Sequence, residues 1–218
     1  MKSAPTAEEL AGAAGQWFAD APPLLRWKMR LRCRTTPFER LVELVPPGAS
    51  VLEVGGGAAL FPALLAHCGL RVRVTGFDRD PERVAAAQRL APRFAAGGSS
   101  LDFRLSDVAG QWPEGRFDVV AVLDLLHHLP PALHEQVVLE AARRLNPGGT
   151  LIFKDMCVRP RWRNWANRLH DLASFGQWIH DAPPERVQGW AEGAGLHLAT
   201  AERLDRLWYG HELMVFRR

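Results

Sequence analysis

The sequence is short of cysteine, of lysine and of long apolar runs. Cys33, Cys68 and Cys157 are too far apart for the ligand spacing of a zinc site and too few for a disulfide framework. No apolar run is long enough to cross a bilayer, and the amino-terminal residues lack the basic-then-apolar pattern of a signal peptide. The sequence therefore predicts a cytoplasmic protein with no transmembrane segment and no metal centre.

The basic residues are nearly all arginine, since only three of the 27 are lysine. Alanine, glycine and proline are abundant as well, so this bias fits GC-rich coding DNA. The net charge of +3 and the pI near 9.0 therefore do not favour a nucleic-acid partner. Apolar residues make up 47% and charged residues 23% of the chain, an ordinary globular composition without repeats. The length predicts a single domain, 1–218.

A glycine-rich stretch, V-L-E-V-G-G-G-A-A-L at 51–60, organises the rest of the sequence. An apolar run ends in three glycines and a helical pattern begins at once, which predicts a strand, a turn and a helix of a parallel α/β sheet. Glycine adopts positive φ and lets a ligand approach the backbone. A dinucleotide fingerprint would need glycine where Leu60 stands, whereas the acid Glu53 suits a ligand that carries positive charge.

The segment E-V-G-G-G followed by a helix resembles motif I of the class I S-adenosylmethionine-dependent methyltransferases, E/D-x-G-x-G-x-G, with Ala59 in place of the third glycine. This resemblance implies a Rossmann-like α/β fold: a doubly wound, seven-stranded, mostly parallel sheet with a C-terminal antiparallel strand, in three αβα layers. It also implies that S-adenosyl-L-methionine is the cofactor.

Further matches to the family follow in the family's order. Asp78 ends an expected strand at 72–78 and is implied to bind the ribose hydroxyls; it could instead be a plain turn residue or cap the helix that follows. Asp107, after a strand at 101–105, matches the acid that contacts adenine in the family. The segment 117–129, F-D to H-H-L, resembles the part that lies along the methionine half of the cofactor, and L-N-P-G-G leads into a fifth strand. The residues implied to bind the cofactor are Glu53, Gly55, Gly56, Gly57, Asp78, Arg79, Asp107, Val108, Leu123 and Asp124.

Residues 1–45 predict a helical lid. Thr6 and Glu9 have capping-box spacing and open a helix that ends near Trp17. Trp17 is predicted either to contact the substrate or to dock this helix on the body of the protein.

The next two expected helices complete the lid. In the first, Leu24, Trp27 and Leu31 form one apolar edge among basic residues, which indicates a solvated face or contact with a membrane surface or an acidic substrate. Thr36 and Glu39 have the spacing of a second capping box, for a helix to about residue 45.

Residues 155–182 form a long connection after the fifth expected strand, at the edge where α/β sheets bind ligands. Its aromatic and basic side chains predict, with equal weight, the wall of an acceptor pocket or a stripe packed on the core. A helix after Pro183 and an antiparallel pair at 196–204 and 212–216 complete the fold. The residues assigned to the substrate are Trp17, Trp162, Trp165, His170 and Trp178.

Methyl transfer from a sulfonium requires mainly alignment and exclusion of water. A base is needed only where the acceptor must lose a proton, and His128 and His180 are the candidates; either could instead only shape the pocket. Asp124, His127 and His128 have helical spacing suited to a metal, but no further ligand supports them, and no metal is expected.

The function that the sequence favours is methyl transfer to a small, aromatic or hydrophobic acceptor, with O-methylation preferred. The segment R-P-R-W-R-N-W at 159–165 is faintly similar to methyltransferases of aryl-polyene pathways, which implies a phenolic acceptor. One alternative is an RNA or protein methyltransferase, although D-L-L-H at 124–127 stands where many nucleic-acid enzymes carry D-P-P-Y. Another is a binding protein without turnover. The sequence specifies no oligomeric state.

Overall fold

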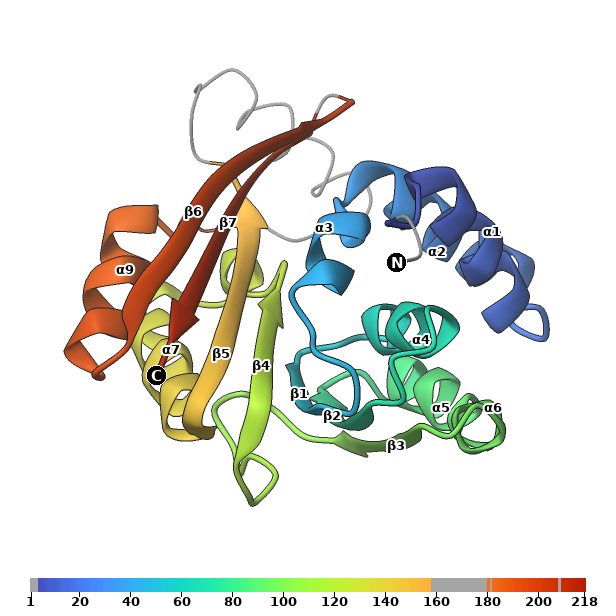
Figure 1. Cartoon of the computed structure of the whole chain (residues 1–218), viewed down its shortest axis with the longest axis horizontal. Coiled ribbons are helices and arrows are strands. Elements are labelled where there is room, and N and C mark those ends of the chain that lie inside the picture. The colour runs from blue at the N-terminus through green and yellow to red at the C-terminus, as the bar shows by residue number, and fades with distance from the viewer. Residues whose placement is uncertain (1–3, 158–179, 181, 208) are drawn as a thin grey trace. The chain divides into compact units, whose positions relative to one another are not determined.

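The computed structural model describes residues 4–157, 180, 182–207 and 209–218 (Figure 1). Its strands form a seven-stranded sheet in the order β3-β2-β1-β4-β5-β7-β6. The chain divides into two compact units, Met1–Glu114 and Gly115–Arg218. The expected fold class is confirmed: the sheet is mostly parallel, with an antiparallel pair at the C-terminus.

The first unit contains three parallel strands and six helices among its described residues. β1 (Ser50–Val54) pairs with β2 (Arg73–Asp78), and β2 pairs with β3 (Ser100–Leu105). β1 is buried on both faces, as a central parallel strand requires, whereas most of β3 is at least partly exposed. The helices are α1 (Ala7–Trp17), α2 (Pro23–Thr35), α3 (Phe38–Glu43), α4 (Leu60–His67), α5 (Pro81–Gln88) and α6 (Ala91–Ala96).

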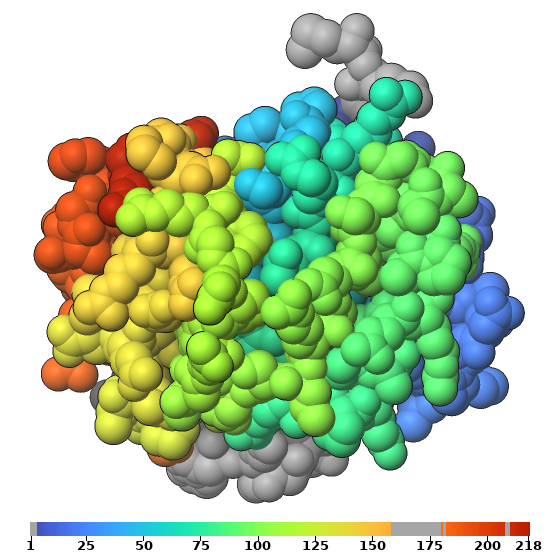
Figure 2. Space-filling model, turned by 90° about the horizontal axis from the view of Figure 1, so that it is seen from below, coloured from blue at the N-terminus to red at the C-terminus, as the bar shows by residue number. Residues whose placement is uncertain are grey.

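The helices of this unit fall into two groups. α5 and α6 pack on β3, and they lie with it at the surface drawn in green in Figure 2. α1 contacts α2, α3 and α4. Its predicted capping box is confirmed: the Glu9 N–H donates to the Thr6 hydroxyl at 3.2 Å, and the Thr6 N–H donates to the Glu9 carboxylate at 2.7 Å.

The expected capping box of α3 is wrong, and the apolar edge expected for α2 faces outward. The residues of α2 that are buried are Met29 and Cys33, whereas Leu24 and Trp27 of the expected apolar edge are exposed. The helix has two apolar stripes, and the bulkier one faces outward. α3 begins at Phe38 without a side-chain cap, because Thr36 ends α2 in an extended conformation and so stands too early to cap the next helix.

Among its described residues, the second unit contains four strands, of which only β4 and β5 are parallel. β4 (Phe117–Leu123) is followed by the short η1 (Leu126–His128) and by α7 (Pro131–Arg143), which leads into β5 (Leu145–Met156). α9 (Pro184–Gly193) precedes β6 (His197–Arg206) and β7 (Tyr209–Arg217). β7 lies antiparallel to both β5 and β6, which confirms the expected terminal pair. α7 and α9 lie side by side (Figure 1).

Candidate active site

The turn after β1 has the conformation that its glycines predict. Gly55 and Gly57 have φ of 64° and 59°. Ala59, at the place of the family's third glycine, also has positive φ, 59°, which is uncommon for a residue with a Cβ. Its methyl group is fully buried and packs with Val84 and Phe103. Core packing therefore compensates for the backbone strain, and alanine replaces glycine here without loss of the turn.

Glu53 lies under this turn and is only 3% exposed. A Cβ on Gly56 would overlap the Glu53 carboxyl, so any larger residue there would displace the Glu53 side chain. Oε2 of Glu53 is buried, and no hydrogen-bond partner for it is found among the described residues. Burial raises the pKa of Glu53 well above its usual value; Asp78 adds to this effect, and Arg32 opposes it. A buried carboxyl with an unsatisfied oxygen is a group that a cationic or hydrogen-bond-donating ligand would complete.

Asp78 connects the end of β2 to the glycine turn. Its Oδ2 accepts from the Gly57 N–H at 2.8 Å, and its Oδ1 accepts from the Asp80 N–H at 2.9 Å. The cap of α5 is Asp80, which accepts from the N–H groups of Glu82 and Arg83, so the interpretation of Asp78 as a helix cap is wrong. Asp78 instead holds the turn in place.

The remaining predicted cofactor residues of the first unit surround the ends of β2 and β3. Arg79 is exposed, and so is Asp107, whose carboxylate accepts from the Ala109 N–H at 2.9 Å. Val108 is buried, and its carbonyl accepts from the Trp112 indole at 2.9 Å. The assignment of Asp107 and Val108 to the adenine stays a prediction.

Trp17 packs within the first unit. Its ring lies 5.1 Å from that of Phe94, and the Arg93 guanidinium lies 4.8 Å above it. Arg93 also donates to the carbonyls of Gln16 and Trp17 at 2.7 and 3.0 Å. These contacts fit the docking interpretation, and contact of Trp17 with the substrate stays a prediction. Trp162, Trp165, His170 and Trp178 lie outside the described residues.

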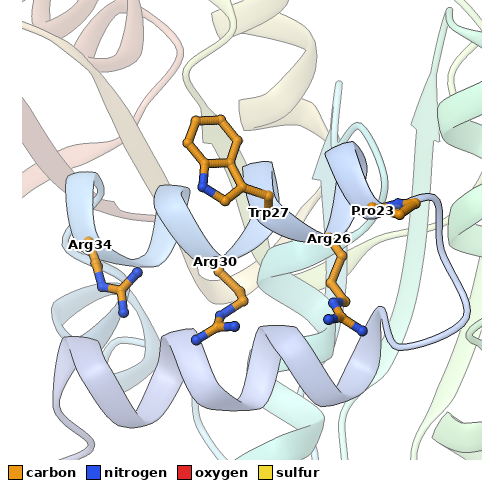
Figure 3. A pocket seen from close by; sticks show the side chains of 5 residues that line it. All are labelled: Pro23, Arg26, Trp27, Arg30 and Arg34. Carbon is orange, nitrogen blue, oxygen red and sulfur yellow. The ribbon is translucent and has the colours of Figure 1, made fainter.

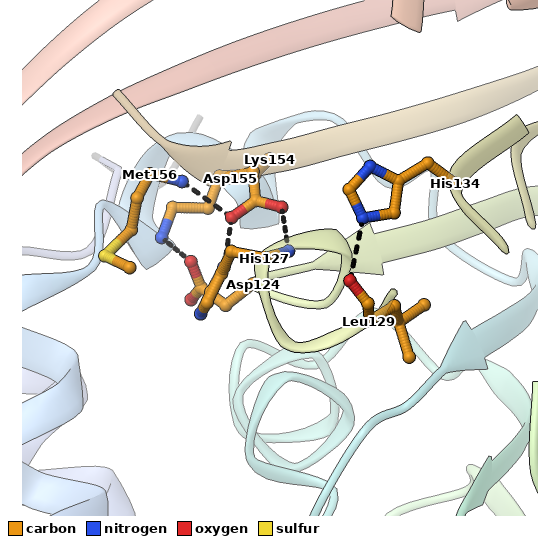
Figure 4. Close-up of polar contacts among 7 residues, drawn as sticks. All are labelled: Asp124, His127, Leu129, His134, Lys154, Asp155 and Met156. Carbon is orange, nitrogen blue, oxygen red and sulfur yellow. Dashed lines mark hydrogen bonds and ion pairs between the residues drawn. The ribbon is translucent and has the colours of Figure 1, made fainter. Parts of the chain in front are cut away.

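In the second unit, Asp124 follows Leu123 at the end of β4 with φ of 52°. Its N–H donates to the Lys154 carbonyl at 2.8 Å, and the Lys154 ammonium lies 2.5 Å from its carboxylate (Figure 4). Lys154 is 0% exposed, so its charge has been taken wholly out of water. Such a charge is stable only when paired, and the pair fixes the turn after β4 on β5.

Asp155, the next residue of β5, holds the same turn through His127 (Figure 4). Its carboxylate contacts His127 Nδ1 and accepts from the His127 N–H at 3.3 Å. Burial opposes ionisation of Asp155, but the charge and the hydrogen bond of His127, with the Met156 N–H, outweigh it and lower the pKa of Asp155. An ionised Asp155 fixes the ring orientation of His127.

The two predicted bases lie beside His127. The ring centroid of His128 is 4.0 Å from that of His127, and the His180 N–H donates to the His127 carbonyl at 2.9 Å. The structure thus brings the histidines of η1 together with His180, across a large gap in sequence. The sequence prediction missed Asp155, whose signal was an acid at the end of the fifth strand.

Asp124, His127 and Asp155 could hold a metal, because one ligand atom of each lies within 4.8 Å of the others. The same atoms already contact the Lys154 ammonium and each other. A cation at this place would have to displace Lys154, so the donor set fits an ion-pair network better than a metal centre.

None of the described helices is both long and apolar enough to cross a membrane.

The fold, with its glycine turn and strand-end acids, is that of the Rossmann-like class I methyltransferases. A family model described as "Methyltransferase domain" matches residues 26–201, and the chain belongs to this family. The methyl donor of these enzymes is S-adenosylmethionine.

Two curated relatives show what the chain is similar to. The chain is 34% identical over 117 residues to a ubiquinone biosynthesis O-methyltransferase of Xanthomonas campestris pv. campestris, covering 52% of this chain and 46% of that protein. It is 30% identical over 158 residues to a ribosomal protein L11 methyltransferase of Burkholderia mallei, covering 72% and 46%. The chain thus spans about half the length of these curated relatives.

Among solved structures, magnesium protoporphyrin IX methyltransferase of Synechocystis PCC 6803 with bound SAH is similar with a TM-score of 0.69 and 19% identity, covering 95% of this chain and 93% of that chain. At this identity the likeness shows the fold alone.

Proposed function

We propose that this chain binds S-adenosylmethionine at its glycine turn and transfers the methyl group to a small aromatic or hydrophobic acceptor, preferably to an oxygen. The observation that carries the cofactor assignment is the buried Glu53 carboxyl with its unsatisfied Oε2. S-adenosylmethionine brings cationic and hydrogen-bond-donating groups, which suit such a carboxyl better than a pyrophosphate does. Asp78 holds the turn through the Gly57 N–H, so the Glu53 side chain and the turn backbone are positioned before the ligand arrives.

Oxygen as the methylated atom is supported by the His127–Asp155 pair. A phenol is largely protonated near neutral pH, and its oxygen becomes a strong nucleophile when a base takes the proton. Asp155 contacts Nδ1 of His127 and orients the imidazole, a group that can take the proton of an acceptor hydroxyl. When bound, the cofactor supplies a methyl group already activated by the sulfonium. His128 and His180 lie beside His127, and they remain candidates for the same role.

A small acceptor is supported by the similarity to the ubiquinone biosynthesis O-methyltransferase, whose name places it in the synthesis of a small molecule. A protein acceptor is the second candidate, because the match to the ribosomal protein L11 methyltransferase extends over more of this chain. The two proposals differ in the size of the molecule that reaches the site.

The test measures release of S-adenosylhomocysteine with three groups of acceptors: phenols and catechols, amines of similar size, and purified ribosomal proteins. We expect turnover with the phenolic group and a methyl ether as product. Turnover confined to ribosomal proteins would replace this proposal by the second one. Bound radiolabelled S-adenosylmethionine with no turnover on any acceptor would indicate a binding protein, and failure to bind it would overturn the cofactor assignment.

A further inference from the structure

The outer face of α2, in the first unit, exposes large apolar side chains to solvent. Four large hydrophobic side chains are exposed among the described residues, and two of them lie one turn apart on this helix: Leu24 at 63% and Trp27 at 58% exposure. Leu31, one turn further along the same face, is half-buried. Single exposed apolar residues are common on soluble proteins, but a stripe of this kind marks a surface that meets an apolar phase or a partner.

The charge of α2 indicates what this apolar surface contacts. The helix has no acidic residue and five basic ones. At 100° per residue, Lys28 flanks the apolar stripe on one side and Arg30 and Arg34 flank it on the other. An apolar stripe bordered by cations is the pattern of helices that lie in the surface of an anionic membrane.

The close-up of α2 shows how these groups are arranged (Figure 3). Arg26, Arg30 and Arg34 extend along the side of α2 that faces α1, and the Trp27 indole extends from the other side. Together with Pro23 they line a shallow hollow of about 310 Å³. Arg34 donates two hydrogen bonds to Glu8 of α1, at 2.9 and 2.6 Å, and Arg30 crosses α1 at Gly15. These contacts fix α2 on α1, so the helix presents its apolar stripe in one orientation.

We propose that α2 binds the surface of an anionic phospholipid membrane. Leu24 and Trp27 enter the boundary between head groups and acyl chains, where an indole is favoured because it is both apolar and a hydrogen-bond donor. Arg26 and Arg30, which line the hollow together with Trp27, bind lipid phosphates. A protein held there would reach acceptors that partition into the bilayer, although the membrane contact itself does not depend on the proposed acceptor.

The experiment is vesicle co-sedimentation with the full chain, without cofactor. One set of vesicles contains phosphatidylcholine alone, and the other contains phosphatidylcholine with about one-third phosphatidylglycerol. We expect binding to the anionic vesicles only, weakened by salt.

Leu24→Ser with Trp27→Ser should reduce the partition coefficient roughly 10- to 100-fold, and Arg26→Gln with Arg30→Gln should remove most of the salt dependence. Leu105→Ser, which removes a side chain of 59% exposure from β3, is the matched control and should bind as the parent does.

Three results would overturn the proposal. The first is no preference for the anionic vesicles. The second is binding that survives in the Leu24→Ser, Trp27→Ser variant, which would place the membrane contact elsewhere on the chain. The third is a dimer in size-exclusion chromatography that the same variant converts to a monomer, because a second copy would then cover the stripe. Circular dichroism of each variant shows that a loss of binding is not a loss of fold.

Discussion

Glu53 couples the stability of the protein to pH. Its pKa is raised by burial, so between the ordinary glutamate pKa and this raised value the folded state holds a proton that the unfolded state has lost. The contribution of Glu53 to stability is therefore complete below the ordinary pKa and declines as the pH rises toward the folded-state pKa. Each unit by which that pKa is raised corresponds to about 1.4 kcal/mol.

Replacing Glu53 by glutamine keeps the shape of the side chain and removes its charge. We expect Glu53→Gln to raise the free energy of unfolding at mildly alkaline pH, to flatten its pH dependence, and at the same time to weaken cofactor binding. Urea unfolding at several pH values and titration calorimetry measure the two effects. Unchanged cofactor affinity would remove Glu53 from the binding site, while an unchanged pH profile would show that the carboxyl titrates normally.

Asp78 offers a test of the glycine turn with a matched control. Asp78→Ala removes the acceptor of the Gly57 N–H and the proposed ribose ligand, and should weaken cofactor binding roughly ten- to a hundredfold. Asp80→Ala removes the cap of α5 and an exposed ion pair with Arg83, which should cost about 1 kcal/mol of stability and leave the affinity unchanged. Calorimetric titration of both variants separates the roles, and equal losses of affinity would contradict the assignment to Asp78.

His127 is expected to act on the acceptor and not on the cofactor. Loss of a general base lowers kcat by about 10²- to 10⁴-fold, so His127→Gln should show this loss with unchanged affinity for S-adenosylmethionine. Asp155→Asn should displace the acid limb of the pH–rate profile, where a general base becomes protonated, because it changes the group that orients His127. His197→Gln, on the exposed start of β6, is the control. If His128→Gln or His180→Gln shows the large loss instead, the base is that residue.

At the level of single residues, the sequence predicted the strand-end acids better than their partners. Glu53 and Asp78 stand at fixed positions relative to glycines and strand ends, so a linear pattern reaches them. Asp155 is different, because its role depends on its contact with His127, 28 residues away. No periodicity or local spacing encodes that contact, which arises from the parallel pairing of β4 with β5.

The glycine turn is the element on which the cofactor proposal depends. Gly56→Ala would place a methyl group on the Glu53 carboxyl, and one of them must move. We expect Gly56→Ala to cause a large loss of cofactor affinity with a modest loss of stability.

Gly12→Ala in α1 is the control, because nothing lies within 4 Å of the new methyl group. Replacing glycine by alanine within a helix should add about 0.5–1 kcal/mol of stability and leave the affinity unchanged. Thermal unfolding and titration of both variants provide the measurement, and retained affinity in Gly56→Ala would contradict the proposed geometry.

Helices α2 and α3 show the limit of element-level prediction. Hydrophobic periodicity identified α2 as a helix and Leu24, Trp27 and Leu31 as its apolar edge, but it did not find the buried stripe of Met29 and Cys33. Periodicity measures how apolar residues repeat and does not record which stripe a neighbouring helix covers. The strands were predicted more closely, since a buried parallel strand is apolar on both faces.

For the whole molecule, a cofactor that binds only the native state must stabilise it by mass action. At a concentration 100 times its Kd, the ligand adds about 2.7 kcal/mol to the free energy of unfolding. For a chain of this size that corresponds to an increase in Tm of about 5–10 °C. We expect S-adenosylmethionine and S-adenosylhomocysteine to produce this shift, and NAD to produce none, because Leu60 replaces the glycine that a dinucleotide requires. Differential scanning calorimetry provides the measurement, and Gly56→Ala should lose most of the shift at the same ligand concentration. A shift with NAD comparable to that with S-adenosylmethionine would mean that the glycine turn does not select for a sulfonium ligand.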